Sequence, residues 1–127
     1  MKVRCLSNRC LSGALDNLSF HPSHDITVGK SYDVYGLSFY LDSKHFGQGL
    51  FVKIVNDSGV IATEPIDLFE IKDGRIFSRW RISNEGDGIN IWPDEFREKY
   101  FFDLLSDGDD SAVQKFSTLR DAILAEG

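Results

Sequence analysis

Two cysteines and two histidines near the N-terminus are of the types that bind zinc. Cys5 and Cys10 are followed by His21 and His24, which gives C-x4-C and H-x2-H with ten residues between the pairs. Thiolate and imidazole groups are common ligands of tetrahedral zinc. The spacing departs from that of zinc fingers, and Cys5 stands in a strand-like run where a thiol acts as a small apolar side chain. We therefore expect no metal and no disulfide, and zinc stays the alternative.

Other catalytic patterns in the sequence are incomplete. His21, His24 and His45 stand in loop-like segments, neither cysteine has the context of a catalytic thiol, and no G-x-S-x-G turn is present. Gly-Lys-Ser at 29–31 resembles the end of a P-loop, but the position of that motif's first glycine holds His24, and a strand-like run follows. We predict that the chain is not an enzyme and takes no cofactor. A small enzyme built on one histidine is an alternative.

Three arginines alternate along the run from Arg75 to Ile82. Arg75, Arg79 and Arg81 share one face of a strand with Phe77, an arrangement that can stack bases and bind phosphates. Nearby acidic residues can instead pair with these arginines across strands. These acids are Asp67, Glu70, Asp73, Glu85 and Asp87. We therefore expect a self-neutralised sheet face and no nucleic-acid partner.

Acidic residues exceed basic ones, and the excess lies late in the chain. The 127 residues include 20 acidic and 14 basic side chains, with a net charge of +1 over 1–50, −3 over 51–100 and −4 over 101–127. A negative surface repels nucleic acid and attracts a basic partner. Solubility alone is the alternative reason for such a charge. With no apolar run of ~18 residues and no signal-peptide pattern, we expect a cytoplasmic protein without a membrane partner.

Alternating apolar residues predict a β-rich part over residues 1–82 of a single domain spanning 1–127, with a loop insertion at 8–25. A phase slip at Gly36 predicts a bulge or bend, and Pro65 closes a strand or lies at an edge. Lys72-Asp73-Gly74 predicts a hairpin turn, whose second arm carries Ile76, Ser78, Trp80 and Ile82 on one face. The expected strands are Lys2 to Ser7, Ser31 to Leu41, Gly49 to Val55, Val60 to Thr63, Leu68 to Ile71 and Arg75 to Ile82.

Apolar spacing near 3.6 predicts two helices over residues 92–126, after a polar loop from Ser83 to Gly88. Pro93 suits the first turn of the first helix, and Asp110 or Ser111 can cap the second. The predicted stripes are Phe96, Tyr100, Phe101, Leu104 and Leu105, then Val113, Phe116, Leu119, Ile123 and Leu124. The predicted fold is α+β and mainly β. It is an antiparallel barrel or curled sheet of five to six strands, followed by a helical hairpin.

Four segments resemble the small SH3-like barrels of bacteria and phages. They are Met1 to Asn8 (MKVRCLSN), Ile26 to Val34 (ITVGKSYDV), residues 52–63 (VKIVNDSGVIAT) and Pro65 to Glu70 (PIDLFE). In those barrels a first strand is followed by a T-V-G-K-x-Y-x-V strand, a hairpin around N-D-x-G and a turn into L-F-E. The resemblance covers about residues 1–71 and implies an SH3-like barrel, with the insertion and the C-terminal helices as departures.

Residues 65–82 (PIDLFEIKDGRIFSRWRI) with the acidic helical tail are similar to immunity proteins of polymorphic toxins, including contact-dependent growth inhibition systems. The similarity implies a cytoplasmic, non-enzymatic bacterial protein that binds a cognate toxin domain of the nuclease type and blocks its active site. An acidic surface can occupy a cleft built for phosphates.

The predicted partner-binding residues are Glu85, Asp87, Asp94, Glu95, Asp107, Asp109 and Asp110, with Trp92 as an aromatic anchor. Core packing under the first helix is the alternative for Trp92. The alternative function is an SH3-like binding or regulatory module for a peptide or nucleic acid, which would use Tyr32, Tyr35, Trp80 and the arginines.

Overall fold

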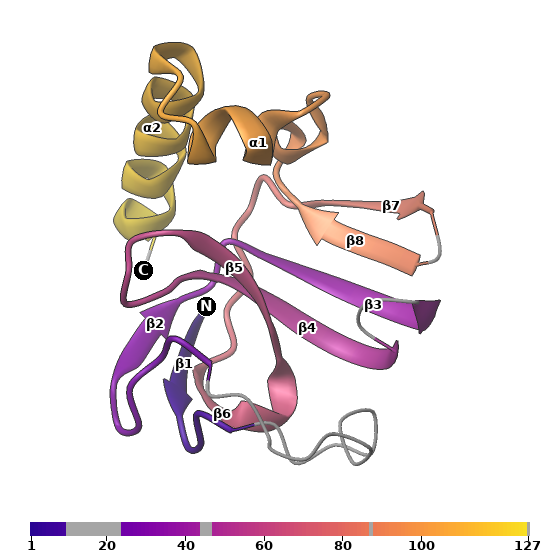
Figure 1. Cartoon of the computed structure of the whole chain (residues 1–127), viewed down its shortest axis with the longest axis vertical. Helices are drawn as coiled ribbons and strands as arrows, with labels where there is room; N and C mark the ends of the chain where they lie inside the picture. The colour runs from indigo at the N-terminus through magenta and orange to yellow at the C-terminus, as the bar shows by residue number, and fades with distance from the viewer. Residues whose placement is uncertain (10–23, 44–46, 87, 127) are drawn as a thin grey trace.

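Eight strands in two antiparallel sheets and a C-terminal helical unit make up the part of the chain that the computed structural model describes, residues 1–9, 24–43, 47–86 and 88–126 (Figure 1). The smaller sheet has the order β2-β1-β6 and the larger one β5-β4-β3-β8-β7. The α+β, mainly β prediction with C-terminal helices is confirmed. The sheets are not closed into a barrel, so the predicted barrel is not confirmed.

The smaller sheet is built around β1 (Lys2–Cys5), flanked by β2 (Ser31–Asp33) and β6 (Phe69–Asp73). Val3 and Cys5 are buried whereas Arg4 is exposed, so the predicted alternation of this strand is confirmed. The last strand of this sheet is reached through the 3-10 helix η2 (Ile66–Leu68). Its return to β1 joins the two ends of the first 73 residues.

The predicted strand from Ser31 to Leu41 is two strands in different sheets. The chain leaves β2 and enters β3 (Gly36–Ser43) at the glycine where the apolar phase slips, so the predicted bend is confirmed. A Cβ at Gly36 would lie 2.8 Å from Cβ of Trp92. Glycine is therefore needed here because another strand passes at close range.

Residues 47–65 form an antiparallel pair, β4 (Gly47–Val55) and β5 (Ile61–Pro65), as predicted. Between them the Asn56 N–H donates to the Val60 carbonyl at 2.9 Å, and Gly59 has a φ of 81°. Pro65 ends an edge strand of the larger sheet, which agrees with its missing N–H donor.

The predicted hairpin at Lys72-Asp73-Gly74 is wrong. β6 ends at Asp73, residues 74–80 run across to the larger sheet, and β7 (Arg81–Glu85) pairs there with β8 (Gly88–Trp92). The expected polar loop from Ser83 to Gly88 is thus mostly strand. The Asp73 carboxylate accepts the Arg75 N–H at 3.0 Å and also binds the guanidinium. This local bond turns the chain without pairing β6 to the residues that follow.

The predicted face of Ile76, Ser78, Trp80 and Ile82 is also wrong. Ile76 is 64% exposed and Ile82 70%, whereas Phe77 and Trp80 are buried. Residues 74–80 pair with no strand, so an alternation of two does not apply to them. The chain buries the two aromatic rings three residues apart instead.

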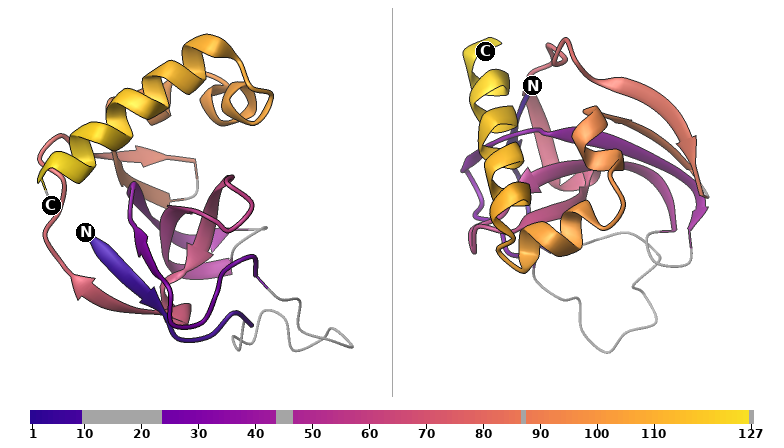
Figure 2. Two further views of the ribbon diagram at one scale, coloured as in Figure 1. Left: turned by 90° about the vertical axis from the view of Figure 1, so that its left-hand side faces the viewer. Right: turned by 90° about the horizontal axis from the view of Figure 1, so that it is seen from above.

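The helical unit packs on one face of the larger sheet. It comprises η3 (Asp94–Arg97), α1 (Phe101–Ser106) and α2 (Asp110–Glu126), and α2 ends near the N-terminus (Figures 1 and 2). The predicted first helix is broken into η3 and α1, because Tyr100 takes a left-handed φ of 62°. Aromatic contacts join the unit to β8 and to the segment between β2 and β3. The ring centroids of Phe102 and Trp92 lie 5.9 Å apart, and those of Phe116 and Tyr35 lie 5.2 Å apart.

The second helix begins at Asp110, and its cap lies one residue before the predicted one. The Asp109 carboxylate, not Asp110 or Ser111, accepts the Ala112 N–H at 3.0 Å. The predicted stripe is partly right. Leu119 and Ile123 are buried, Phe116 is half-buried, and Val113 and Leu124 are exposed.

Candidate functional site

Five of the predicted partner-binding acids lie on the helical unit. Asp94 and Glu95 belong to η3, Asp107 follows α1, Asp109 caps α2 and Asp110 is its first residue. All except the half-buried Glu95 are exposed. Residues 94–126 contain nine acidic and four basic side chains, which gives this unit a net charge of −5. We call these five acids the acidic cap surface.

The structure ties the η3 end of the acidic cap surface to α2. The Glu98 carboxylate accepts hydrogen bonds of 2.9 and 2.8 Å from Nζ of Lys115, and Glu95 lines a shallow cavity of about 190 Å³ with Gln114 and Lys115. Asp94 pairs loosely with Arg97 at 3.6 Å. These contacts hold η3 against α2, so the two groups of acids belong to one packed unit.

The remaining predicted residues are placed differently. Glu85 ends β7, and Asp87 lies outside the described residues. Trp92 is 7% exposed, and its ring packs against Phe96 and Phe102. It is therefore not available as an exposed anchor, and the alternative of core packing applies, because η3 and α1 fold over the end of β8.

Lys53, which stands in no recognisable sequence motif, is buried beneath the helical unit. It is 8% exposed and lies in the second half of β4. Its Nζ donates to Oγ1 of Thr63 and lies 4.8 Å from the Phe102 ring centroid and 5.3 Å from that of Trp92. Burial lowers the pKa of this amine to about 8. The rings stabilise the cation in a site that excludes water.

On the opposite face of the sheet from Lys53, a half-buried histidine lies against a buried carboxylate. Nδ1 of His24 contacts the carboxylate of Glu64, which is buried in β5. Burial raises the pKa of Glu64, and His24 opposes that rise. Cys5 is buried, its thiol donates to the Ser7 carbonyl at 3.3 Å, and burial raises its pKa. A raised thiol pKa makes a poor nucleophile.

The predicted C-x4-C and H-x2-H set falls partly outside the described residues, which include neither Cys10 nor His21; His45 is outside them too. Within the described residues, no group of three or more His, Cys, Asp or Glu side chains is arranged to hold a metal ion. His24, the histidine that is described, is committed to Glu64.

Asp57, in the turn between β4 and β5, joins two side chains of the segment before β2 and one side chain of β2 itself. It accepts 2.8 Å hydrogen bonds from Nζ of Lys30 and the hydroxyl of Tyr32, and another bond from Thr27. These donors lower the pKa of Asp57 to about 2. The network fixes the T-V-G-K-x-Y segment against the N-D-x-G turn, which is a structural role.

The aromatic residues and arginines of the alternative function do not form one exposed groove. Tyr32, Tyr35 and Trp80 are buried. Arg75 binds Asp73, Arg79 lies 5.2 Å from the Phe77 ring centroid, and Arg81 belongs to β7. The predicted arginine face fails because residues 74–80 are not a strand.

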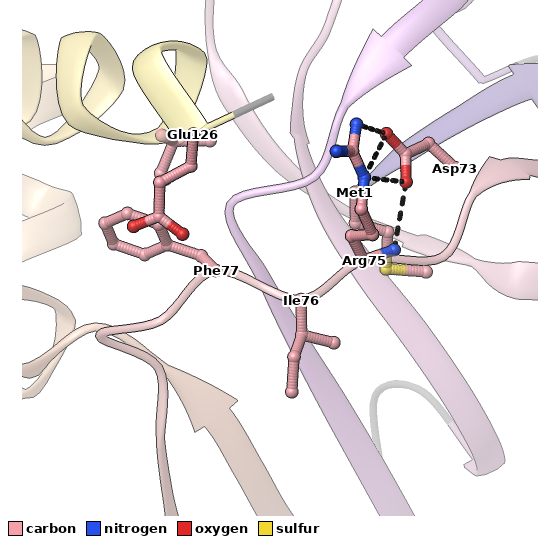
Figure 3. Close-up of a pocket in the computed structure, with 7 residues that line it drawn as sticks. Met1, Asp73, Arg75, Ile76, Phe77 and Glu126 are labelled. Carbon is pink, nitrogen blue, oxygen red and sulfur yellow. Dashed lines mark hydrogen bonds and ion pairs between the residues drawn. The ribbon is translucent and has the colours of Figure 1, made fainter.

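A cavity of about 410 Å³ opens where α2 ends beside the N-terminus (Figure 3). Its walls include Met1, Ile76, Phe77 and the ion pair of Asp73 and Arg75. On its other side Glu126 accepts hydrogen bonds from the N–H and hydroxyl of Ser78, which lower the pKa of Glu126. Its two carboxylates are therefore already bound within the protein.

Searches of family models, curated proteins and solved structures found no match for this chain. Across the described ranges, no helix has the length and apolar character needed to cross a bilayer.

Proposed function

We propose that this protein is an immunity-type inhibitor that binds a cognate toxin domain through the acidic cap surface. It acts in the cytoplasm without catalysis or a cofactor, and its partner is a nuclease whose cleft is basic. In the proposed complex the acids occupy the positions in the toxin's cleft at which the phosphates of its substrate bind, so the inhibitor blocks the cleft by charge complementarity. This function also rests on the similarity of residues 65–82 and the acidic tail to immunity proteins.

One observation carries the proposal: three exposed acids cluster at the α1–α2 junction. Asp107, Asp109 and Asp110 lie within four residues, and the unit that bears them has a net charge of −5. Because α2 is anchored by Leu119 and Ile123 in the core, this charge is held on a fixed support. A preorganised charged surface speeds encounter with a basic partner and needs little ordering on binding.

We also propose that residues 1–71 are related to SH3-like barrels. The N-terminal strand pairs with both β2 and β6, and β3, β4 and β5 form a meander, with η2 just before the last strand. This order supports the resemblance of the T-V-G-K, N-D-x-G and L-F-E segments. On this proposal the β7–β8 hairpin extends the barrel's sheet along β3.

The test is co-purification with the toxin domain encoded by the adjacent gene, followed by measured affinity and toxin cleavage assays. The variant Asp107→Lys/Asp110→Lys reverses two acids and keeps the cap of α2. Its matched control is Asp67→Lys/Glu70→Lys, which changes the net charge equally at exposed sites on η2 and β6.

We expect the first variant to bind at least about tenfold more weakly at 0.15 M salt, with the deficit shrinking at high salt, and the control to bind as the wild type does. Equal affinity of both variants would refute the assignment of the acidic cap surface. Absence of any complex with the adjacent gene product would refute the immunity function.

A further inference from the structure

The two edges of the larger sheet differ in how far they are protected. Its strand order ends at β5 on one side and β7 on the other. β5 ends in Pro65, and Glu64 beside it is paired with His24. Proline and inward charges are devices that keep an edge strand from pairing with another chain.

The edges of the smaller sheet are also poor templates. β2 has only three residues, and β6 carries the charged side chains of Glu70 and Lys72. β6 does present Ile71, 52% exposed, but between those two charges. The charges of β7, Arg81 and Glu85, stand at its two ends, and between them lie Ile82, 70% exposed, and uncharged Ser83 and Asn84. The uncharged centre of β7 suits it to accept a strand.

An apolar sheet face adjoins this edge. Trp92 of β8 and Lys53 of β4 contact the helical unit. Because side chains alternate along a strand, the residues next to them in β8 and β4 lie on the opposite face of the sheet. On that opposite face Ile82 stands across from Ile91, and Phe39 stands between Ile89 and Leu50. Phe39 is 39% exposed, and Ile89 and Leu50 are half-buried. Contiguous exposed apolar surface marks interaction sites, and here such surface continues to the open edge.

The sequence of β7 is complementary to itself when two copies run antiparallel. With Ser83 opposite Ser83 of a second copy, Arg81 stands opposite position 85, which is Glu, and the same contact occurs twice. Ile82 stands opposite Asn84, and the two Ile82 residues become diagonal neighbours near the axis. This is the geometry of an isologous two-fold interface, in which one patch contacts itself.

We propose that β7 is a self-association site, through which two copies of the chain join their larger sheets into one continuous sheet centred on Ser83. Pairing satisfies the outer backbone groups of the edge strand and covers Ile82. A stable interface buries about 1,000 Å² of accessible surface or more, and five residue pairs bury less than that. The dimer is therefore weak, with a dissociation constant on the order of 100 µM, and forms independently of the acids on the helical unit.

The test is sedimentation equilibrium of the full chain from about 10 µM to about 1 mM. The mass of the wild type should rise from 14.4 kDa toward twice that value. Ile82→Lys should remove the rise, because it places two lysines beside the axis. Ile76→Lys is the matched control, since Ile76 is 64% exposed and lies outside β7.

Charge exchange tests the register. Arg81→Glu should weaken association at least about tenfold by setting two acids opposite each other, and Arg81→Glu/Glu85→Arg should restore it. Circular dichroism establishes that each variant is folded. A wild type that stays monomeric at 1 mM, association that Ile82→Lys leaves intact, or an exchange variant that stays weak would each overturn the proposal.

Discussion

The buried amine of Lys53 makes stability depend on pH in a way that one substitution removes. Its pKa falls from an ordinary 10.5 to about 8, because the sheet and the rings of Trp92 and Phe102 exclude water from it. Between pH 8 and 10.5 the unfolded chain holds this proton and the folded chain does not. Stability therefore rises with pH across that window.

The magnitude follows from the size of the shift. The fall of the pKa from 10.5 to about 8 corresponds to a destabilisation of the folded state by about 3 kcal/mol. This destabilisation is present in full at pH 7, where the buried amine is still charged. Lys53→Met keeps an unbranched side chain and removes the titration. The variant also loses the hydrogen bond between Lys53 and Thr63, which costs about 1 kcal/mol at every pH. This cost offsets part of the stability gained by removing the buried charge. We expect it to be more stable than the wild type at pH 7.

The assay is urea unfolding followed by tryptophan fluorescence at pH 7, 8, 9 and 10 under reducing conditions. The stability difference, variant minus wild type, should fall by roughly 2–3 kcal/mol between pH 7 and 10. Burial raises the pKa of Cys5 and raises that of Tyr35 to about 12, so both lower stability at high pH. Both groups are present in each chain and cancel in the difference. A difference that stays constant with pH would refute the reasoning.

Two further substitutions test the folded framework by thermal and urea unfolding. Asp109→Ala should lower the free energy of unfolding by about 1 kcal/mol, because it removes the hydrogen bond to the Ala112 N–H. Asp110→Ala removes the same charge but no cap, so it should lower that free energy by less than half as much. Equal losses would contradict the assigned cap. Gly36→Ala should lower the free energy of unfolding by about 1–3 kcal/mol, because its Cβ would lie 2.8 Å from Trp92. Gly74→Ala is the control: its Cβ would meet nothing closer than 3.8 Å, so stability should change by no more than about 0.5 kcal/mol. Similar effects at both glycines would refute the close approach.

Local signals predicted the elements whose geometry is local. Val3 and Cys5 alternate with exposed residues, the turn at 56–59 joins the expected strands, and Pro65 lies at an edge. The bend at Gly36 was also predictable, because the apolar phase changes there. These features depend on periodicity and on backbone preferences that a few neighbouring residues carry.

The Asp73-Gly74 hairpin failed because two partners competed for one strand. The turn residues favour a hairpin, but β1 offers β6 an apolar edge, and Arg75 satisfies Asp73 within the loop. Strand pairing between distant segments outweighed the local signal. Phe77 and Trp80 are buried although they lie in a loop, and the alternation of apolar residues in a strand does not predict their burial.

For the candidate site, the sequence by itself determined the concentration of acid after residue 94, since charge is a property of composition. Only the tertiary structure decided that Trp92 is covered by η3 and α1, that Lys53 is buried beneath Phe102, and that His24 contacts Glu64. Each of these depends on which segments far apart in the chain pack together. Burial and pairing of charges are set by that packing, whose free energy is summed over the whole core rather than over any one segment.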